Sequence, residues 1–281
     1  MTLRLASLLE VAEQFDAIVL DQWGVLHDGT VPYAGSIECL AQLKAAGCTL
    51  AVLSNSGKRA AANMKRIADM GFARSLFDVV MTSGEALWQD IRQGRVAERC
   101  FFPIERAPGD AEAWADGLDV ALTDTVETAK AILLMGLPDN AIDASFASTF
   151  DAALSLGMPV LCTNPDRASP RADGRIVVSP GALAHAHATR GGDVRFYGKP
   201  HLPVFQSLEA ALGVSAAQLL MVGDSLEHDV AGGHGAGWST AFVEGGLHAM
   251  RFQDNDPTRV LAVLVADAAA PTPDFAIPRL K

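Results

Sequence analysis

Short apolar runs that end in small or charged residues recur along the chain and alternate with helix-patterned stretches. The runs are AIVLD (17–21), TLAVLSNS (49–56), DVVMTS (78–83), QLLMVGDS (218–225) and STAFVEG (239–245). Helix patterns cover residues 36–46 and 58–70, and a glycine follows each of them as a stop signal. This alternation predicts an α/β fold with a doubly wound, Rossmann-like parallel sheet covered by helices on both faces.

Four of these strand candidates end at a residue that could take part in chemistry. The residues are Asp21, Ser54, Ser83 and Asp224. In an open parallel sheet, ligands bind beyond the carboxyl ends of the strands. We therefore expect these four residues to converge, although they are far apart in the sequence.

The middle of the chain has strand and helix patterns of its own. The strand candidates are RCFFPI (99–104), DVALT (119–123), AKAILLMG (129–136) and MPVLCTN (158–164), and residues 144–157 have a helix pattern. We predict a discontinuous core domain, residues 1–85 plus 195–281, and an α/β domain inserted at 86–194. The proline-rich tail, residues 270–281, is expected to be extended.

Composition narrows the class of protein. The chain has 281 residues, 49% of them apolar and 20% charged, which excludes intrinsic disorder and suits about two domains. A net charge of −11, with no run of Lys and Arg, argues against nucleic-acid binding. No signal peptide and no apolar stretch of membrane-spanning length is found, so no membrane association is expected. The four cysteines form no CxxC pair, as in reduced core thiols of a cytoplasmic protein.

Four local patterns occur in a fixed order around the insert. They are AIVLDQWGVLHDG (17–29), VLSNSGK (52–58), FYGKP (196–200) and MVGDSLEHDV (221–230). Together they resemble the haloacid dehalogenase-like (HAD) hydrolases. An insert between the second and third patterns, with TNPD (163–166) and PGALAHA (180–186), resembles class IIA, the NagD-like and 4-nitrophenyl phosphatase-like enzymes. The resemblance implies a HAD core whose inserted α/β domain acts as a cap over the site.

The carboxylates at the strand ends are suited to nucleophilic attack and metal binding. Asp21, held at the end of a buried strand, can attack phosphorus and form an acyl-phosphate. Asp21 and Asp224 would repel each other without a cation, and oxygen ligands of this kind suit Mg²⁺. The resemblance adds the backbone carbonyl of Trp23 as a metal ligand. Asp229 is predicted to orient Lys199 or a metal-bound water.

Further polar residues are candidates for holding the phosphate and the rest of the substrate. Ser54 and the amides after it, with Asn55 beside it, can donate hydrogen bonds to phosphoryl oxygens. Lys199 can neutralise charge that develops between Asp21 and the phosphoryl group. In class IIA the inserted domain contacts the leaving group, and we predict that Asn164 and Asp166 of TNPD face the substrate.

The first pattern departs from that of HAD phosphatases, which carry Asp-x-Asp there. The second Asp supplies the general acid, but this chain has Trp23, whose indole nitrogen can only donate. Three consequences compete. His27 or Asp28, otherwise ordinary loop residues, could replace the acid; the leaving group could need no proton, or the bond cleaved could differ; or the protein could bind a phosphorylated ligand with little or no turnover.

The combined reading is a Mg²⁺-dependent HAD-type hydrolase. Its expected substrate and partner is a small phosphorylated metabolite, a sugar- or nucleotide-phosphate-like monoester. Hydrolysis would pass through an aspartyl-phosphate on Asp21. The alternative is a phosphometabolite-binding protein or a hydrolase of different chemistry, and a homodimer is left open.

Overall fold

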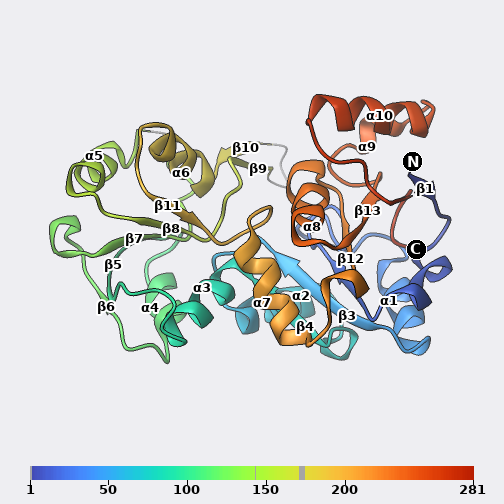
Figure 1. Cartoon of the computed structure of the whole chain (residues 1–281), viewed down its shortest axis with the longest axis horizontal. Helices are drawn as coiled ribbons and strands as arrows, with labels where there is room; N and C mark the ends of the chain where they lie inside the picture. The colour runs from blue at the N-terminus through green and yellow to red at the C-terminus, as the bar shows by residue number, and fades with distance from the viewer. Residues whose placement is uncertain (1, 143, 171–174) are drawn as a thin grey trace. The chain divides into compact units, whose positions relative to one another are not determined.

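The computed structural model describes residues 2–142, 144–170 and 175–281, and it divides into two compact units. The core unit comprises Met1–Ser54, Met64–Met81 and Lys199–Lys281, and the inserted unit comprises Asn55–Asn63 and Thr82–Gly198. Figure 1 labels their helices and strands. The short segment Asn55–Asn63 thus groups with the inserted unit, whereas the predicted boundaries place it in the core. The predicted domain boundaries remain a prediction.

A seven-stranded sheet forms the centre of the core unit. In sheet order its strands are β1 (Leu3–Arg4), β14 (Phe275–Ile277), β13 (Ser239–Val243), β12 (Leu219–Gly223), β2 (Ala17–Leu20), β3 (Thr49–Ser54) and β4 (Val79–Thr82). The pairs from β1 through to β3 are parallel. The predicted parallel α/β core is confirmed.

Helices accompany the core sheet. They are α1 (Ser36–Ala45), α2 (Ala60–Asp69), α7 (Leu202–Leu212), α8 (Ala231–Ala236), α9 (Ala249–Phe252) and α10 (Pro257–Asp267). The first turn of α2, up to Asn63, groups with the inserted unit, and the rest of the helix belongs to the core unit. The central strands β2 and β12 are buried along their whole length, which explains why they read as continuous apolar runs rather than as alternating ones. Their side chains pack with helix residues such as Leu40, Leu43 and Ile67 in one core cluster.

The C-terminal tail contains a strand that the sequence analysis did not predict. Phe275–Ile277 pairs in parallel with both β1 and β13. Prolines at 273 and 278 bracket this three-residue apolar run, so it carries too little periodicity to identify it as a strand. Residues 275–277 of the tail are therefore extended and belong to the sheet.

The inserted unit has a parallel sheet of its own. In sheet order its strands are β11 (Val194–Phe196), β8 (Val160–Cys162), β7 (Ala131–Leu134), β5 (Cys100–Ile104) and β6 (Ala121–Leu122). An antiparallel pair, β9 (Ala168–Pro170) and β10 (Ile176–Val178), is separate from it. The helices of this unit are α3 (Ser83–Arg92), α4 (Asp110–Ala115), α5 (Ala147–Leu156) and α6 (Pro180–Thr189).

Candidate active site

Three adjacent core strands deliver polar residues to the same edge of the sheet. Leu20 of β2 lies opposite both Val52 of β3 and Val222 of β12 in the parallel register. The residues that follow these positions, Asp21, Ser54 and Asp224, therefore stand at neighbouring carboxyl ends. Ser83 directly follows β4 and begins α3, which groups with the inserted unit, so its predicted convergence with the other three residues stays a prediction.

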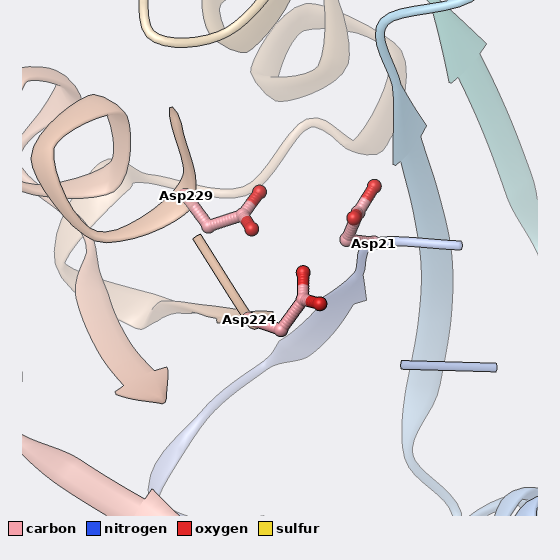
Figure 2. Close-up of side chains that lie close together, drawn as sticks. All are labelled: Asp21, Asp224 and Asp229. Atoms are coloured by element: carbon pink, nitrogen blue, oxygen red, sulfur yellow. The ribbon is translucent and has the colours of Figure 1, made fainter. Parts of the chain in front are cut away.

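Three carboxylates of the core unit form a compact group, which we call the aspartate cluster: Asp21, Asp224 and Asp229. One oxygen of each lies within 4.8 Å of the others. Figure 2 shows that these side chains come from different segments, with Asp21 directly after β2 and Asp224 after β12. Asp229 belongs to a helical turn, Leu226–Val230, that follows β12.

Lys199 places its ammonium group between two members of the aspartate cluster. Its Nζ lies 2.7 Å from Asp21 Oδ1 and 2.6 Å from Asp229 Oδ1. The Lys199 side chain is 3% exposed and that of Asp229 1%, while Asp21 keeps 16% of its side chain accessible. Asp229 also accepts a hydrogen bond from the Ser225 amide at 3.0 Å, which fixes its second oxygen. Of the two carboxylates that Lys199 contacts, Asp21, the candidate nucleophile, is therefore the more accessible to solvent.

Burial and mutual repulsion set the charge balance of the cluster. Burial raises the pKa of Asp21, and the charge of Asp229 adds to this rise, while Lys199 opposes it. Burial, together with the charges of Asp21 and Asp229, raises the pKa of Asp224 well above its usual value. For Lys199 burial opposes the charged form, but the carboxylates of Asp21 and Asp229 prevail and raise its pKa. The lysine stays protonated at neutral pH, while burial and mutual repulsion disfavour the charged forms of Asp21 and Asp224.

The loop after Asp21 folds back on itself around Trp23. Gly29, at φ +104°, lies against the indole: a Cβ added there would be 3.3 Å from the ring nitrogen. Trp23 is half-buried, and no described contact places its backbone carbonyl toward a metal. The Trp23 carbonyl therefore remains a predicted ligand.

The two residues that could have replaced the missing acid are engaged in the same loop. His27 is 1% exposed, its Nδ1 accepts the Gly29 amide at 3.0 Å, and burial with the Arg66 charge lowers its pKa to about 4. The Asp28 carboxylate accepts hydrogen bonds from the Val31 amide and from the amide and hydroxyl of Thr30, which lower its pKa to about 2. Neither group carries a transferable proton at neutral pH.

The remaining predicted substrate residues lie together in the inserted unit. Asn55 Nδ2 donates to Asp166 Oδ1 at 2.8 Å, and the Asp166 amide donates to Asn164 Oδ1 at 3.0 Å. Asn55, directly after Ser54 in the chain, is therefore joined to the TNPD segment, residues 163–166. Their predicted contact with substrate stays a prediction.

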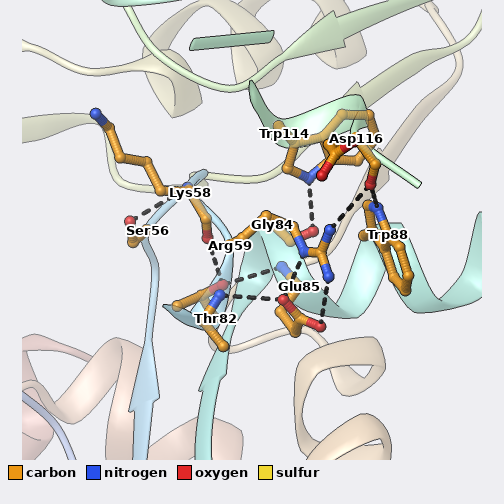
Figure 3. Close-up of polar contacts among 10 residues, drawn as sticks. Ser56, Lys58, Arg59, Thr82, Gly84, Glu85, Trp88, Trp114 and Asp116 are labelled. Atoms are coloured by element: carbon orange, nitrogen blue, oxygen red, sulfur yellow. Dashed lines mark hydrogen bonds and ion pairs between the residues drawn. The ribbon is translucent and has the colours of Figure 1, made fainter. Parts of the chain in front are cut away.

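The inserted unit contains a second polar group, which we call the Arg59–Glu85 cluster (Figure 3). It consists of Arg59, Glu85, Trp88 and Trp114 and the backbone carbonyls that the two indoles contact. Arg59 pairs with Glu85 through two hydrogen bonds of 2.7 and 3.3 Å. The Arg59 guanidinium lies 3.6 Å above the Trp88 ring, and the indole nitrogens of Trp88 and Trp114 donate to the carbonyls of Asp116 and Gly84. Both tryptophans are buried core residues of this unit.

Sequence reasoning missed one segment beside the aspartate cluster. Leu247, after β13, donates its amide hydrogen to Asp224 Oδ2 at 2.6 Å, and Gly246 packs against the same carboxylate. A usable signal was present, because the pair Gly245–Gly246 follows a buried strand at the ligand-binding edge of a parallel sheet.

Comparisons with known proteins agree with this fold. Family models described as haloacid dehalogenase-like hydrolase and HAD-hydrolase-like match residues 18–113 and 196–268. Rat chronophin is 30% identical over 257 residues, covering 88% of this chain and 82% of chronophin. The sugar-phosphatase AraL of Bacillus subtilis is 26% identical, covering 80% of this chain and 82% of AraL.

A solved structure extends the likeness to the whole chain. A haloacid dehalogenase-like hydrolase from Brucella suis 1330 superposes with a TM-score of 0.81 at 26% identity, covering 99% of this chain and 100% of that one. The chain belongs to the haloacid dehalogenase-like hydrolases, and it is a phosphatase-type hydrolase with the inserted α/β domain of class IIA. None of the helices within the described ranges is long and apolar enough to cross a membrane.

Proposed function

We propose that this protein is a Mg²⁺-dependent phosphatase that hydrolyses a small phosphate monoester through a phosphoenzyme on Asp21. The observation that carries the proposal is the contact of Lys199 with both Asp21 and Asp229 inside a group of three carboxylates. The likeness to AraL, named a sugar-phosphatase, supports a small phosphorylated metabolite as substrate.

The donor set fits a divalent cation. Three carboxylates within 4.8 Å share one ammonium group, and burial with mutual repulsion raises the pKa values of Asp21 and Asp224. An added positive charge would relieve this repulsion, and hard oxygen ligands favour Mg²⁺ among common cations. Asp21 and Asp224 would hold the ion, with the Trp23 carbonyl as a further ligand. When bound, it would neutralise the phosphoryl oxygens during attack.

The remaining catalytic roles fall to Asp21, Lys199 and Ser54. Lys199 binds Asp21 Oδ1, so Oδ2 is the oxygen that attacks phosphorus. A bond forms from Oδ2 to phosphorus while the bond to the leaving oxygen breaks, and that oxygen departs with the electron pair. Water next attacks the phosphorus, which releases inorganic phosphate and restores the Asp21 carboxylate. Lys199 offsets the charge that develops, and Ser54 donates to a phosphoryl oxygen.

The leaving group must depart with little help from a proton. Trp23 cannot give one, and the states of His27 and Asp28 leave neither with a proton to donate at neutral pH. General acid catalysis is worth about 10² to 10⁴ in rate, so its loss penalises alkyl esters most. We propose that the substrate is an ester whose leaving group is stable as an anion, such as a phenolate or an enolate.

Steady-state kinetics with Mg²⁺ on 4-nitrophenyl phosphate and on an alkyl phosphate tests this proposal. We expect kcat/KM to favour the nitrophenyl ester by about 10² or more, and Trp23→Asp to narrow that gap by accelerating the alkyl ester. Equal rates for both esters in the wild type would show that another group supplies the acid. The second candidate function is a phosphometabolite-binding protein, and the observation that favours it is Trp23 at the position of the general acid. Binding of inorganic phosphate without turnover of any ester would support this candidate.

A further inference from the structure

Two glycines from separate loops press on the carboxylate of Asp224. A Cβ added to Gly24, after β2, would lie 1.8 Å from Asp224 Oδ2, and one added to Gly246, after β13, would lie 2.2 Å from the same oxygen. The position at Gly246 is also 2.6 Å from the Gly24 carbonyl oxygen. No side chain fits at either place unless the carboxylate moves, so the backbone itself forms the walls around Asp224.

A backbone donor fixes one oxygen of this carboxylate. The Leu247 amide donates to Asp224 Oδ2 at 2.6 Å, a short, charge-assisted hydrogen bond. The Leu247 side chain is 52% exposed, so the contribution of this residue comes from its main chain. With Oδ2 held between an amide and two glycines, rotation of the carboxylate is restricted and Oδ1 becomes the oxygen available to a ligand.

The loop that carries these groups, the Gly-Gly-Leu loop (residues 245–247), is anchored from its other side. Glu244, 5% exposed, forms an ion pair with Arg4 through two hydrogen bonds, and the one from Arg4 Nη2 to Glu244 Oε2 measures 2.9 Å. The Glu244 amide donates to the Ile277 carbonyl at 3.0 Å. These contacts tie the start of the loop to the sheet edge formed by β1 and β14.

We propose that the Gly-Gly-Leu loop is a positioning element for the divalent cation, acting through Asp224 without touching the ion. The inference rests on the proposed function, because it takes Asp224 to be a metal ligand. Groups that orient a metal ligand typically change metal affinity by 10- to 100-fold when they are altered. The glycine at 246 is therefore required by the space that the Asp224 carboxylate occupies.

Isothermal titration of the metal-free protein with Mg²⁺ alone tests the inference without any assay of activity. We expect Gly246→Ala to bind Mg²⁺ about 10- to 100-fold more weakly than the wild type. The matched control is Gly235→Ala in α8, where an added Cβ meets nothing within 4 Å. This control should bind as the wild type does. Equal affinity for Gly246→Ala and Gly235→Ala would overturn the proposal.

A second pair of variants tests the hydrogen bond and covers the case in which Gly246→Ala does not fold. Leu247→Ala keeps the amide hydrogen and should leave the affinity unchanged, whereas Leu247→Pro removes it and should weaken Mg²⁺ binding about tenfold. Circular dichroism and a cooperative melt establish that each variant is folded. Unchanged affinity in folded Leu247→Pro would contradict the role of the amide.

The same titrations separate a failure of this inference from a failure of the proposed function. If the wild type binds Mg²⁺ and Asp224→Asn does not, the metal site stands, and the loop variants decide the inference alone. If the wild type takes up no Mg²⁺, or Asp224→Asn binds it equally well, the proposed metal site is wrong and the loop's role falls with it.

Discussion

The aspartate cluster and the Arg59–Glu85 cluster are both polar groups of low exposure, yet their charges are balanced differently. In the first, whose three carboxylates are drawn in Figure 2, Lys199 contacts two of them, and burial raises the pKa values of Asp21 and Asp224. In the second, whose Arg59–Glu85 pair is drawn in Figure 3, burial again opposes charge on Glu85, but the Arg59 guanidinium and the Ala60 amide outweigh it, so the pKa of Glu85 is lowered.

This difference in charge balance indicates that the aspartate cluster serves to bind a ligand, whereas the Arg59–Glu85 cluster serves to stabilise the fold. The Arg59–Glu85 cluster pairs its charges internally and hydrogen-bonds its indoles to backbone carbonyls. In the aspartate cluster, burial and mutual repulsion disfavour the charged carboxylates, and a bound cation would relieve that repulsion. Strained electrostatics of this kind concentrate at functional sites, because a folded protein gains nothing from it otherwise.

The largest effect expected is on activity, from Asp21→Asn. The amide has the shape of the carboxylate but cannot form an acyl-phosphate, so kcat should fall by at least about a thousandfold. Initial rates with 4-nitrophenyl phosphate measure it. Asp69→Asn is the control, since Asp69 forms only an exposed pair with Lys65 and should keep full activity. Undiminished turnover in Asp21→Asn would remove the nucleophile from the mechanism.

Arg59→Ala should affect stability and leave Mg²⁺ affinity unchanged. The substitution leaves Glu85, with 13% of its side chain exposed, without its cation, and we expect the free energy of unfolding to fall by about 2 kcal/mol. Urea denaturation measures this. Lys65→Ala breaks an ion pair whose side chains are 77% and 65% exposed, so its effect should stay below about 0.5 kcal/mol. A loss of Mg²⁺ binding in Arg59→Ala would contradict the assignment of a purely structural role to the Arg59–Glu85 cluster.

Asp224→Asn should stabilise the metal-free protein. It removes one charge from the repelling group and keeps an oxygen for the Leu247 amide, so in the presence of a chelator the free energy of unfolding should rise by about 1 kcal/mol. The control is Asp78→Asn, which should destabilise, because the Lys44 pair and the Leu50 amide lower the pKa of Asp78. Destabilisation by both variants would mean that the aspartate cluster carries no excess charge.

The smallest effect expected is a pH dependence with opposite signs in the two clusters. A carboxyl whose folded pKa is raised costs stability as the pH rises from its usual value of 3.8 to the raised folded pKa, so acidification through that window stabilises the metal-free core. Glu85, whose pKa is lowered, contributes stability that is lost only below about its usual 4.5.

Urea melts in chelator between pH 7.5 and 5.5 separate these terms. Relative to Asp224→Asn, the wild type should gain stability as the pH falls over this range, because its folded state takes up a proton that the variant cannot bind. Glu85→Gln should show the same gain as the wild type, since Glu85 does not titrate there. An identical pH profile for wild type and Asp224→Asn would speak against a raised pKa.

The fold and the central residues could be predicted because they follow from continuous patterns. The buried strands around Leu20, Val52 and Val222 are unbroken apolar runs, and parallel register alone brings Asp21 and Asp224 to one edge. The resemblance to the family supplied Lys199, which stands in a short GKP segment that carries no periodicity.

Other features could not be predicted because they depend on contacts between residues far apart in the sequence. The bond between Asn55 and Asp166 spans 111 positions, and the one between Leu247 and Asp224 uses a main-chain amide that leaves no mark on residue type. The low pKa of His27 follows from burial and a neighbouring charge, and neither can be read from a loop sequence. The strand Phe275–Ile277 is too short to show a pattern.

The central claim is that Asp21 attacks the phosphorus of the substrate. Trapping the covalent intermediate tests this claim most directly. Wild-type protein mixed with Mg²⁺ and 4-nitrophenyl phosphate is quenched in acid within the first turnovers, digested, and mapped by mass spectrometry. The account predicts one phosphoryl group, on the peptide that carries Asp21, and none in Asp21→Asn. Turnover accompanied by a phosphoryl group on another residue would contradict it.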